Sequence, residues 1–539
     1  MPPEFAPLAE RIVDALLESS PDTARFAGDH RYDDRLPDYS PGAVAGDVAM
    51  LHGASVALSQ VDDDELDPQD RVDHAVLLAR VEQALFELTE IREHEWNPLE
   101  HNPGPLLYAL IARPFAPAAQ RLESLAGRLD AVPDALATAR AVLTDCPRIH
   151  LETAVGQFAG AAGLVRDQVP ELLAEAPELA GRVEPAAARA AAALDEFGDW
   201  LRKRLAADEA GRDPRLGRPL WEARLWHTLD TELPAAEVMA RAWATLDAVN
   251  EELRAEAAHF VGGTADDGTV RAALARLGDD HPDNTTIVEL ARETLRETTD
   301  FVTDHELVSL VDDPCVVQEM PEFARGVAVA YCQPPGPLET AELPTFYSIA
   351  PAPADWPAER VESFYREYNN YLVRNLTVHE AMPGHFLQMA HSRRFRGSTR
   401  ARALGFSGPF VEGWAVYAEE LMVRYGFGGP QVRLQQLKMQ LRMTLNAIID
   451  QLVHCEGLGE TEAMELMTGR GFQEEGEAAG KWRRALLTST QLSTYFVGYL
   501  EVSAIGQARP PDTSVQAWHD AMLVHGSPPP RHLRTLLAL

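Results

Sequence analysis

Helical periodicity runs through most of the chain and constrains its fold more than any other feature. Apolar residues recur at three- and four-residue spacing in a first stretch at Phe5–Leu17 and in a longer one at Asp70–Arg92. This spacing places them on one face of an α-helix. Similar stretches cover residues 106–141, 185–205, 235–260 and 284–306, and prolines or glycines separate them. Long helices joined by short breaks predict a mainly α, bundle-like body.

One segment, at about residues 314–351, departs from this pattern. It is rich in β-branched and aromatic residues and is interrupted by prolines. Within it, Gly326–Cys332 and Thr345–Ala350 predict two short strands of a small β-ribbon. Helical periodicity then returns from Arg360 to the end of the sequence, and neither a repeat nor a Gly/Ser-rich linker interrupts it. We therefore predict a single domain over residues 1–539.

The charge balance excludes some partners. The chain has 83 acidic and 48 basic residues, which gives a formal net charge of -35. A nucleic-acid-binding protein needs a basic face, and the sequence has no run rich in Lys and Arg. We expect neither nucleic acid nor a membrane as a partner. The acidic excess is interpreted as a solvated surface that keeps the protein soluble, and it also favours cationic or neutral substrates.

Cysteine usage and the terminal sequence bear on location. The four cysteines are scattered and form no C-x-x-C pair, which excludes a disulfide framework and a thiolate zinc site. The first residues lack the basic segment and apolar core of a secretion signal, and no window of about 18 uncharged apolar residues occurs. We therefore expect a cytoplasmic protein.

The segment at residues 377–388 (TVHEAMPGHFLQ) carries the strongest chemical signal. A zinc hydrolase needs imidazole ligands, an open position for water and a carboxylate beside that water, usually written H-E-x-x-H. His379 and His385 are six residues apart, so an unbroken helix would turn their side chains about 120° away from each other. Because Pro383 and Gly384 lie between them, we predict an irregular turn that brings His385 back beside His379. Glu380 would then activate the attacking water.

A third metal ligand is expected further along the chain, in the segment at residues 411–420 (VEGWAVYAEE). Glu412 and Glu419 are seven residues apart, which places them on one face of a helix. We predict that Glu412 binds the metal and that Glu419 orients a ligand histidine. The helices of the metal site are expected at about residues 372–425.

The two segments together resemble the signature of a known family. HEAMPGHFLQ followed by EGWAVYAEE is similar to the DUF885 family of bacterial proteins, which resemble the M32 carboxypeptidases in fold and, more distantly, the M3 oligopeptidases. Those peptidases carry His-Glu-x-Gly-His followed by a metal-binding Glu. The likeness extends to residues 21–40, 321–335 and 447–454, and so to nearly the whole chain. It implies a single two-lobed, zincin-like helical body with a deep channel.

The resemblance also implies an oxyanion stabiliser. The segment at residues 492–499 (LSTYFVGY) is similar to an M32 stretch in which a tyrosine precedes an apolar residue and a glycine, and this tyrosine corresponds to Tyr495. A phenol that donates to the developing oxyanion stabilises charge present only in the transition state. Tyr499, four residues on, is the substitute candidate.

Four residues are candidates for substrate contact. His454 follows Asp450 by one helical turn, and this pair either faces substrate or, as we favour, is buried and structural. A carboxypeptidase recognises a terminal carboxylate, which a guanidinium group binds well. Arg442, Arg483 and Arg484 are available for this, although helix-surface salt bridges explain them equally well.

The sequence thus predicts a zinc-dependent hydrolase of peptide or amide bonds with one Zn²⁺ per chain. One alternative is a specialised amidase or lyase that acts on a small metabolite with the same metal site. The other is a non-catalytic binding protein that retains the fold, which the widened histidine spacing favours. Substrate identity and oligomeric state stay open.

Overall fold

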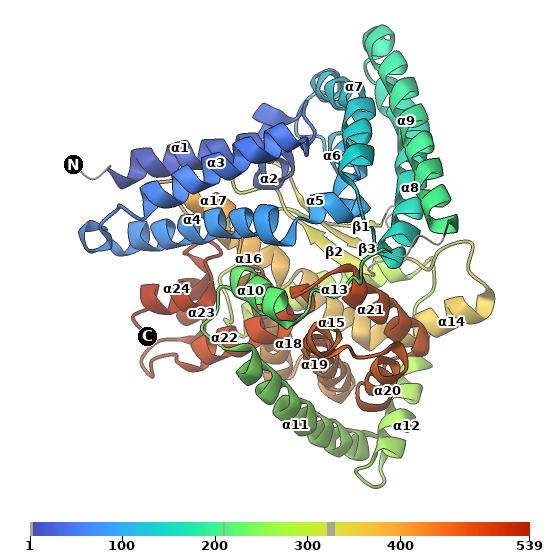
Figure 1. The fold of residues 1–539 in the computed structure, drawn as a ribbon. Helices are drawn as coiled ribbons and strands as arrows, with labels where there is room; N and C mark the ends of the chain where they lie inside the picture. The colour runs from blue at the N-terminus through green and yellow to red at the C-terminus, as the bar shows by residue number, and fades with distance from the viewer. Residues whose placement is uncertain (1–3, 208–210, 321–328) are drawn as a thin grey trace. The chain divides into compact units, whose positions relative to one another are not determined.

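The computed structural model describes residues 4–207, 211–320 and 329–539 and is mainly helical, as predicted (Figure 1). Its contacts divide the chain into two units. The first comprises residues 1–214, 335–343 and 397–405, and the second comprises residues 215–334, 344–396 and 406–539. The single domain, the two-lobed zincin-like body and the deep channel stay predictions.

The first unit holds two hydrophobic cores. One lies among α1–α4 and α17 and includes Leu17, Leu58 and Leu77. The other lies among α6–α9 and includes Phe158 and Phe197. The helices are α1 (Phe5–Ser19), α2 (Pro21–Ala27), α3 (Pro41–Leu58), α4 (Pro68–Phe86), α5 (Glu93–Trp96), α6 (Gly104–Ala112), α7 (Ala118–Val142), α8 (Arg148–Leu173), α9 (Ala180–Ala206) and α17 (Ala401–Leu404), with short helical turns η1 (His30–Tyr32), η2 (Asp63–Glu65), η3 (Glu87–Ile91), η4 (Pro98–His101) and η5 (Pro177–Leu179).

The second unit holds the small sheet and the helices that carry the predicted site. Two cores stabilise it, one around Trp414 and Phe410 and one around Trp221 and Phe496. Its helices are α10 (Arg218–Leu229), α11 (Ala235–Val261), α12 (Asp267–Gly278), α13 (Ile287–Asp304), α14 (Ala358–Glu367), α15 (Asn370–Glu380), α16 (His385–Ser392), α18 (Gly408–Arg424), α19 (Gly429–Gln451), α20 (Glu460–Arg470), α21 (Glu475–Leu487), α22 (Thr494–Gln507), α23 (Val515–Leu523) and α24 (Pro530–Leu536), with η7 (Leu452–Glu456) and η8 (Gln491–Ser493).

The sheet has three strands, one more than the sequence predicted. β2 (Ala330–Gln333) pairs antiparallel with β3 (Thr345–Ile349), which confirms the ribbon, although residues 326–328 of its first strand lie outside the described residues. β1 (Cys315–Glu319) adds to the other side of β3 in parallel, so the order is β1-β3-β2. Tyr347 and Ile349 of β3 are fully buried. Among the described residues, β2 is therefore an edge strand of this sheet.

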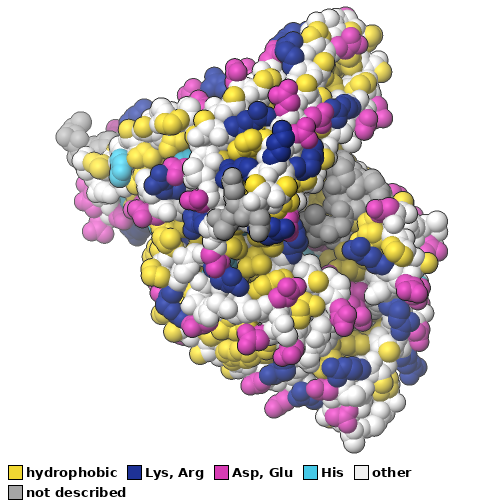
Figure 2. Space-filling model, turned by 45° about the vertical axis from the view of Figure 1, so that its right-hand side comes forward, with side chains coloured by type: hydrophobic (Ala, Val, Ile, Leu, Met, Phe, Trp, Pro, Cys, Tyr) yellow, Lys and Arg dark blue, Asp and Glu magenta, His cyan; other side chains and the backbone are white. Residues whose placement is uncertain are grey.

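Acidic and basic side chains both occur widely on the face that Figure 2 shows, and several Lys and Arg side chains lie near one another in its upper central part. In the described part of the chain, every helix falls short of the length or apolar content that spanning a bilayer requires.

Candidate metal centre

The chain breaks its helix between the two predicted histidine ligands. α15 starts at the cap residue Asn369, whose side chain accepts from two backbone N–H groups, and it ends at Glu380. α16 starts at His385, after a cis Met382–Pro383 peptide bond. The predicted irregular turn is therefore present, but as a complete break and not as a bulge in one helix. It brings the rings of His379 and His385 to a centroid distance of 4.7 Å, nearly perpendicular to each other.

Gly384 allows this tight return of the chain. A Cβ atom at this position would lie 1.9 Å from the backbone oxygen of His379, so only glycine fits without a backbone shift. The Gly384 N–H donates to the backbone oxygen of Val378 at 3.0 Å. The indole N–H of Trp414 on α18 donates to the backbone oxygen of Pro383 at 2.8 Å and fixes the turn from outside. Both the sequence of the turn and a neighbouring helix thus define the position of His385.

Glu412 on α18 completes the predicted ligand set. Its Oε2 atom lies 3.5 Å from His379 Nε2 and 3.6 Å from His385 Nε2. Zinc–ligand distances of about 2.0–2.2 Å place the ligand atoms of a tetrahedral site about 3.3–3.6 Å apart. The same oxygen is buried and has no hydrogen-bond partner among the described residues. Two imidazoles and a carboxylate with this spacing fit a zinc ion.

Glu419 lies behind His379, as predicted. Its Oε1 atom accepts a hydrogen bond from His379 Nδ1 at 2.7 Å, and Asn375 donates to its Oε2 atom at 2.6 Å. Because Nδ1 carries the proton of the neutral ring, Nε2 faces Glu412, and a cation that displaces the second ring proton would bind at Nε2. Glu419 is 1% exposed, so burial holds this arrangement away from water.

The charges of the site favour a cation. Burial lowers the pKa of His379, but the carboxylates of Glu412 and Glu419 outweigh burial and hold this pKa well above its usual value. Burial likewise opposes ionisation of Glu412, yet the two histidines hold the pKa of its carboxyl well below the usual range. The carboxylates of Glu380, Glu412 and Glu419 thus surround two imidazoles. A divalent cation would balance this surplus of negative charge.

Glu380 is buried close to the two histidines. It is 7% exposed, and burial raises its pKa above the ordinary value, although both histidines oppose the shift. The backbone of Cys332 in β2 donates a hydrogen bond to its carboxylate. A carboxylate with a raised pKa beside a metal site is suited to take a proton from water and to return it.

Tyr495 is held near Glu412 by close packing of two helices. α18 and α22 touch at Gly413 and Gly498, where a Cβ atom on Gly413 would lie 2.3 Å from the backbone oxygen of Gly498. The charge of Glu412 is the main cause of a raised pKa at Tyr495. Arg484 on α21 donates to the Tyr495 hydroxyl oxygen at 3.2 Å. The phenol therefore lies in the electrostatic field of Glu412, and Arg484 donates to its oxygen.

Tyr499, the substitute candidate, contacts other residues. Its hydroxyl donates to Glu420 Oε2 at 2.5 Å and accepts from Gln440 at 3.2 Å. Tyr499 lies four residues after Tyr495, so it is displaced by about 6 Å along the helix axis and rotated by about 40° around it. This displacement takes its side chain past the site that Tyr495 faces. The structure therefore favours Tyr495 over Tyr499.

His454 and Arg442, two of the four candidate substrate residues, contact other parts of the second unit. His454 is buried, accepts from the backbone N–H of Leu216 and faces two backbone oxygens, of Ala485 and Thr488, with its other nitrogen. Arg442 forms an ion pair with Glu477. Arg483 is exposed, and its neighbour Arg484 is the arginine beside Tyr495. His454 therefore has the surroundings of a buried structural residue, which is the interpretation that the sequence favoured.

Sequence reasoning missed two contributors to the site, Asn375 and Gly413, and left a third, Arg484, undecided. Asn375 precedes His379 by one helical turn, a spacing that could have identified it as a partner on the same face. Gly413 directly follows Glu412, but its contact with Gly498 depends on the packing of two helices distant in sequence. Arg484 was one of three arginines among which the sequence could not choose.

Comparison with known proteins defines the family of the chain. The sequence profile of the family described as "Bacterial protein of unknown function (DUF885)" matches residues 21–537. A search of curated proteins found no match. A solved structure of a candidate lipoprotein of unknown function from Shewanella oneidensis is 26% identical, with a TM-score of 0.83 over 100% of both chains.

A second solved structure, of a candidate lipoprotein from Colwellia psychrerythraea, has a TM-score of 0.80 at 16% identity, and the match covers 99% of this chain and 98% of that one. This second likeness concerns the fold alone. The family profile covers nearly the whole chain, so the protein belongs to the DUF885 family of bacterial proteins.

Proposed function

We propose that this protein is a zinc-dependent hydrolase of peptide or amide bonds, with one Zn²⁺ per chain held by His379, His385 and Glu412. One observation carries the proposal: His379 Nε2 and His385 Nε2 lie 3.5 and 3.6 Å from Glu412 Oε2, at the spacing of tetrahedral zinc ligands. The same three residues form a possible metal-binding group whose ligand atoms all lie within 4.8 Å of one another.

The neighbouring residues supply the remaining chemistry. A bound zinc ion would polarise the scissile carbonyl and acidify the attacking water. Glu380, buried and with a raised pKa, would take the proton of that water and deliver it to the leaving amine. Tyr495 would donate to the oxyanion, and Arg484, which donates to the phenol oxygen, would keep the hydroxyl proton directed away from itself.

The edge strand β2 favours an extended substrate. Its residue Cys332 donates a backbone hydrogen bond to Glu380, which places one end of the strand beside the proposed base. An extended substrate that lay along this strand would pass the proposed base, and we therefore propose peptides over small metabolites as substrates.

The substitution Glu380→Gln tests the proposal. The variant should retain one zinc per chain and lose at least about 100-fold in hydrolysis, because the proton acceptor is removed while the ligands stay. A matched control is Glu420→Gln, since Glu420 contacts Arg424 and Tyr499 and should leave turnover unchanged. Normal hydrolysis by Glu380→Gln would contradict the assigned chemistry.

Substrates are sought with a peptide library and a panel of small amides, before and after removal of metal with a chelator. Hydrolysis of small amides alone would favour the metabolite amidase. A zinc-loaded protein that cleaves neither set would favour the non-catalytic binding protein.

Cellular location is a separate proposal. The sequence predicts a cytoplasmic protein, whereas both similar solved structures are described as candidate lipoproteins. We retain the cytoplasmic location, and fractionation of cells that produce the full-length protein tests it. Recovery in the membrane fraction would overturn it.

A further inference from the structure

The second unit contains two buried lysines with different surroundings. Lys438 on α19 is 7% exposed, and its ammonium group pairs with the carboxylate of Glu367 at 2.7 Å. Lys481 on α21 is 6% exposed, and no other described residue forms a hydrogen bond or an ion pair with its ammonium group. A buried charge without a partner lowers stability. A residue that is kept at such a cost is typical of a functional site.

The charges near Lys481 are mostly positive. Burial and the guanidinium groups of Arg442 and Arg484 hold the pKa of Lys481 well below its usual value, and Glu477 is the carboxylate that opposes them. Glu477 is already paired with Arg442 and accepts from the Tyr368 hydroxyl at 3.2 Å. The described residues thus leave a surplus of positive charge at Lys481, which an anion would balance.

Arg484 offers further donors on the same face of α21. It follows Lys481 by three residues, a spacing that makes two side chains neighbours on a helix. Arg484 donates to the side-chain oxygen of Gln491 at 2.8 Å and to the Tyr495 hydroxyl at 3.2 Å, and both contacts use Nη2. Its Nη1 and Nε atoms meet no acceptor within the described part of the chain. The ammonium group of Lys481 and these guanidinium N–H groups can therefore donate to one anion.

These two cations are connected to the candidate metal centre through Tyr495. The Tyr495 hydroxyl accepts from Arg484, and the charge of Glu412 is the main cause of the raised pKa of this phenol. An anionic group of a substrate bound at the metal centre could therefore contact Arg484 and Lys481. The chain as a whole has a net charge of -35, so the positive surplus is a local feature of this helix face.

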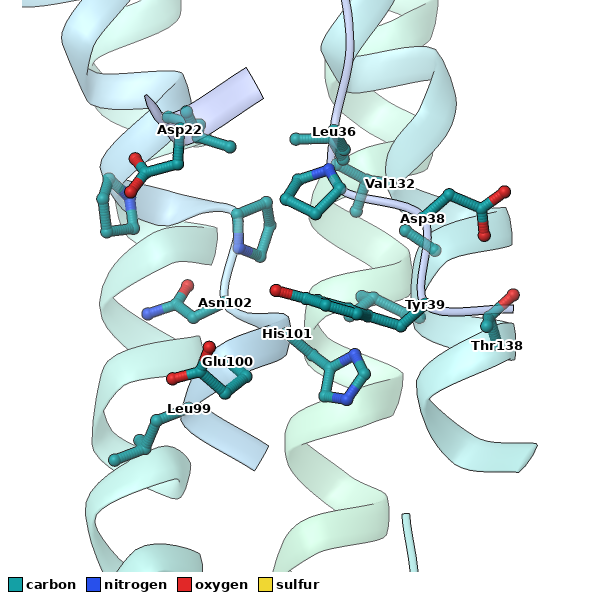
Figure 3. A pocket seen from close by; sticks show the side chains of 16 residues that line it. Asp22, Leu36, Asp38, Tyr39, Leu99, Glu100, His101, Asn102, Val132 and Thr138 are labelled. Atoms are coloured by element: carbon teal, nitrogen blue, oxygen red, sulfur yellow. The ribbon is translucent and has the colours of Figure 1, made fainter. Parts of the chain in front are cut away.

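The cavity of the first unit has different surroundings (Figure 3). The carboxylates that line it already interact within the chain: Asp22 pairs with Arg25, and Asp38 accepts from the Ser40 N–H at 2.9 Å. Glu100 also has an interaction there. The cavity therefore differs from Lys481, whose buried charge has no partner among the described residues.

We propose that Lys481 and Arg484 bind a carboxylate group of the substrate, so that the protein acts on peptides or amides that carry such a group. The inference rests on the proposed hydrolase, since it assigns the substrate class of the same site. A peptide can supply the carboxylate from its C-terminus or from an acidic side chain, and either would accept from the same donors. The proposal replaces the expectation of cationic or neutral substrates, which was based on the net charge of the whole chain.

Calorimetric titration of the full chain with three small compounds tests the proposal. N-acetylleucine carries a terminal carboxylate, N-acetylglutamic acid α-amide carries a side-chain carboxylate, and N-acetylleucine amide carries neither. At least one carboxylate should bind with a Kd below about 10 mM, and the neutral amide should bind at least about tenfold more weakly. The carboxylate that binds more tightly identifies the source. No binding of either carboxylate up to about 50 mM, or equal binding of the neutral amide, would overturn the proposal.

The titration is repeated after treatment of the protein with a chelator, because a zinc ion would itself bind a carboxylate. Binding at Lys481 should persist, whereas binding that is lost with the metal would contradict the proposal. The titration does not depend on turnover. Carboxylate binding without any hydrolysis would support the anion site and contradict the proposed hydrolase, and hydrolysis without a preference for carboxylates would contradict the anion site alone.

Three substitutions locate the binding. Lys481→Met should weaken carboxylate binding at least about tenfold and leave the urea midpoint unchanged or raised, because it removes an unpaired buried charge at similar side-chain length. Lys438→Met should lower the midpoint, since it leaves Glu367 buried without its partner. Lys203→Met, at an exposed position of α9, should change neither quantity. Carboxylate binding by Lys481→Met like that of the parent protein, or a midpoint lowered as in Lys438→Met, would overturn the proposal.

Discussion

The Nδ1 atom of His379 donates to Glu419 Oε1 at 2.7 Å, and this contact determines which ring nitrogen faces Glu412. Without it, His379 could adopt the other tautomer or rotate, and its Nε2 lone pair would no longer be directed at the candidate metal position. Asn375 in turn fixes Glu419, so a chain of two hydrogen bonds within the second unit orients one ligand.

The substitution Glu419→Gln should therefore weaken zinc binding by about 10- to 100-fold, because the charge that orients and polarises the imidazole is lost. Competition with a chromophoric chelator measures this affinity. Glu420→Gln, one residue further along α18, should leave zinc affinity unchanged. Equal affinities for both variants would show that the contact does not support a metal ligand.

Because Gly413 packs closely against Gly498, adding one methyl group at Gly413 should lower stability strongly. Gly413→Ala places a Cβ atom 2.3 Å from the Gly498 backbone oxygen, so α18 and α22 must move apart. We expect a loss of about 2 kcal/mol in the free energy of unfolding, measured with urea, together with weaker zinc binding.

The control for this change is Gly480→Ala, at an exposed position of α21 where a Cβ atom meets nothing within 4 Å. Alanine has the higher helix propensity, so this variant should be as stable as the parent protein or more so. Gly413→Ala with unchanged stability and unchanged zinc affinity would show that the two helices do not need to approach so closely.

The buried surroundings of His519 predict that the free energy of unfolding depends on pH. Its Nδ1 faces the backbone oxygen of Leu307 at 2.7 Å and its Nε2 faces the Tyr417 hydroxyl at 2.9 Å, a pattern that suits the neutral ring. Burial lowers its pKa to about 4. The unfolded chain therefore takes up this proton first as pH falls, so the stabilisation is complete above about pH 6.5 and is lost toward pH 4.

Between pH 7.5 and pH 5 this residue should contribute about 2 kcal/mol of the loss in unfolding free energy. Urea unfolding at both pH values measures the loss, and His519→Gln should show a smaller one. If the parent protein and the variant lose the same amount, His519 is not the titrating group.

The two tyrosines of α22 should differ in their effect on turnover. Tyr495→Phe should lower kcat by about 100-fold with little change in KM, because the hydroxyl acts only on transition-state charge. Tyr499→Phe removes hydrogen bonds to Glu420 and Gln440 and should lower stability while leaving kcat near that of the parent. The reverse order of effects would exchange the roles of the two residues.

The local backbone features of the candidate metal site were predictable from the sequence. The break at Pro383-Gly384 and the seven-residue spacing of Glu412 and Glu419 each depend on backbone geometry within one segment. The convergence of these segments was predicted from the need for a third metal ligand, and local periodicity could not show it, because the contact between α15 and α18 joins residues about 40 positions apart. β1 was missed since its partner β3 follows only after 25 further residues.

Buried polar residues were the other feature that could not be predicted from the sequence. In α4 the apolar residues at three- and four-residue spacing include Val72 and Val81, which are buried, and Ala75, Leu78 and Leu85, which are only half-buried. Asp73 and His74 are buried instead, because Asp73 pairs with Arg402 of α17 at 2.7 Å and His74 contacts the Leu58 backbone oxygen. Apolar periodicity cannot detect a buried ion pair whose partner is more than 300 residues away.

Anomalous diffraction at the zinc edge, from crystals of protein incubated with zinc, tests the central claim most directly. The account predicts one peak per chain, within about 2.0–2.2 Å of His379 Nε2, His385 Nε2 and a Glu412 carboxylate oxygen. Zinc-treated crystals with no peak at these three side chains, or with the peak held by other residues, would contradict it.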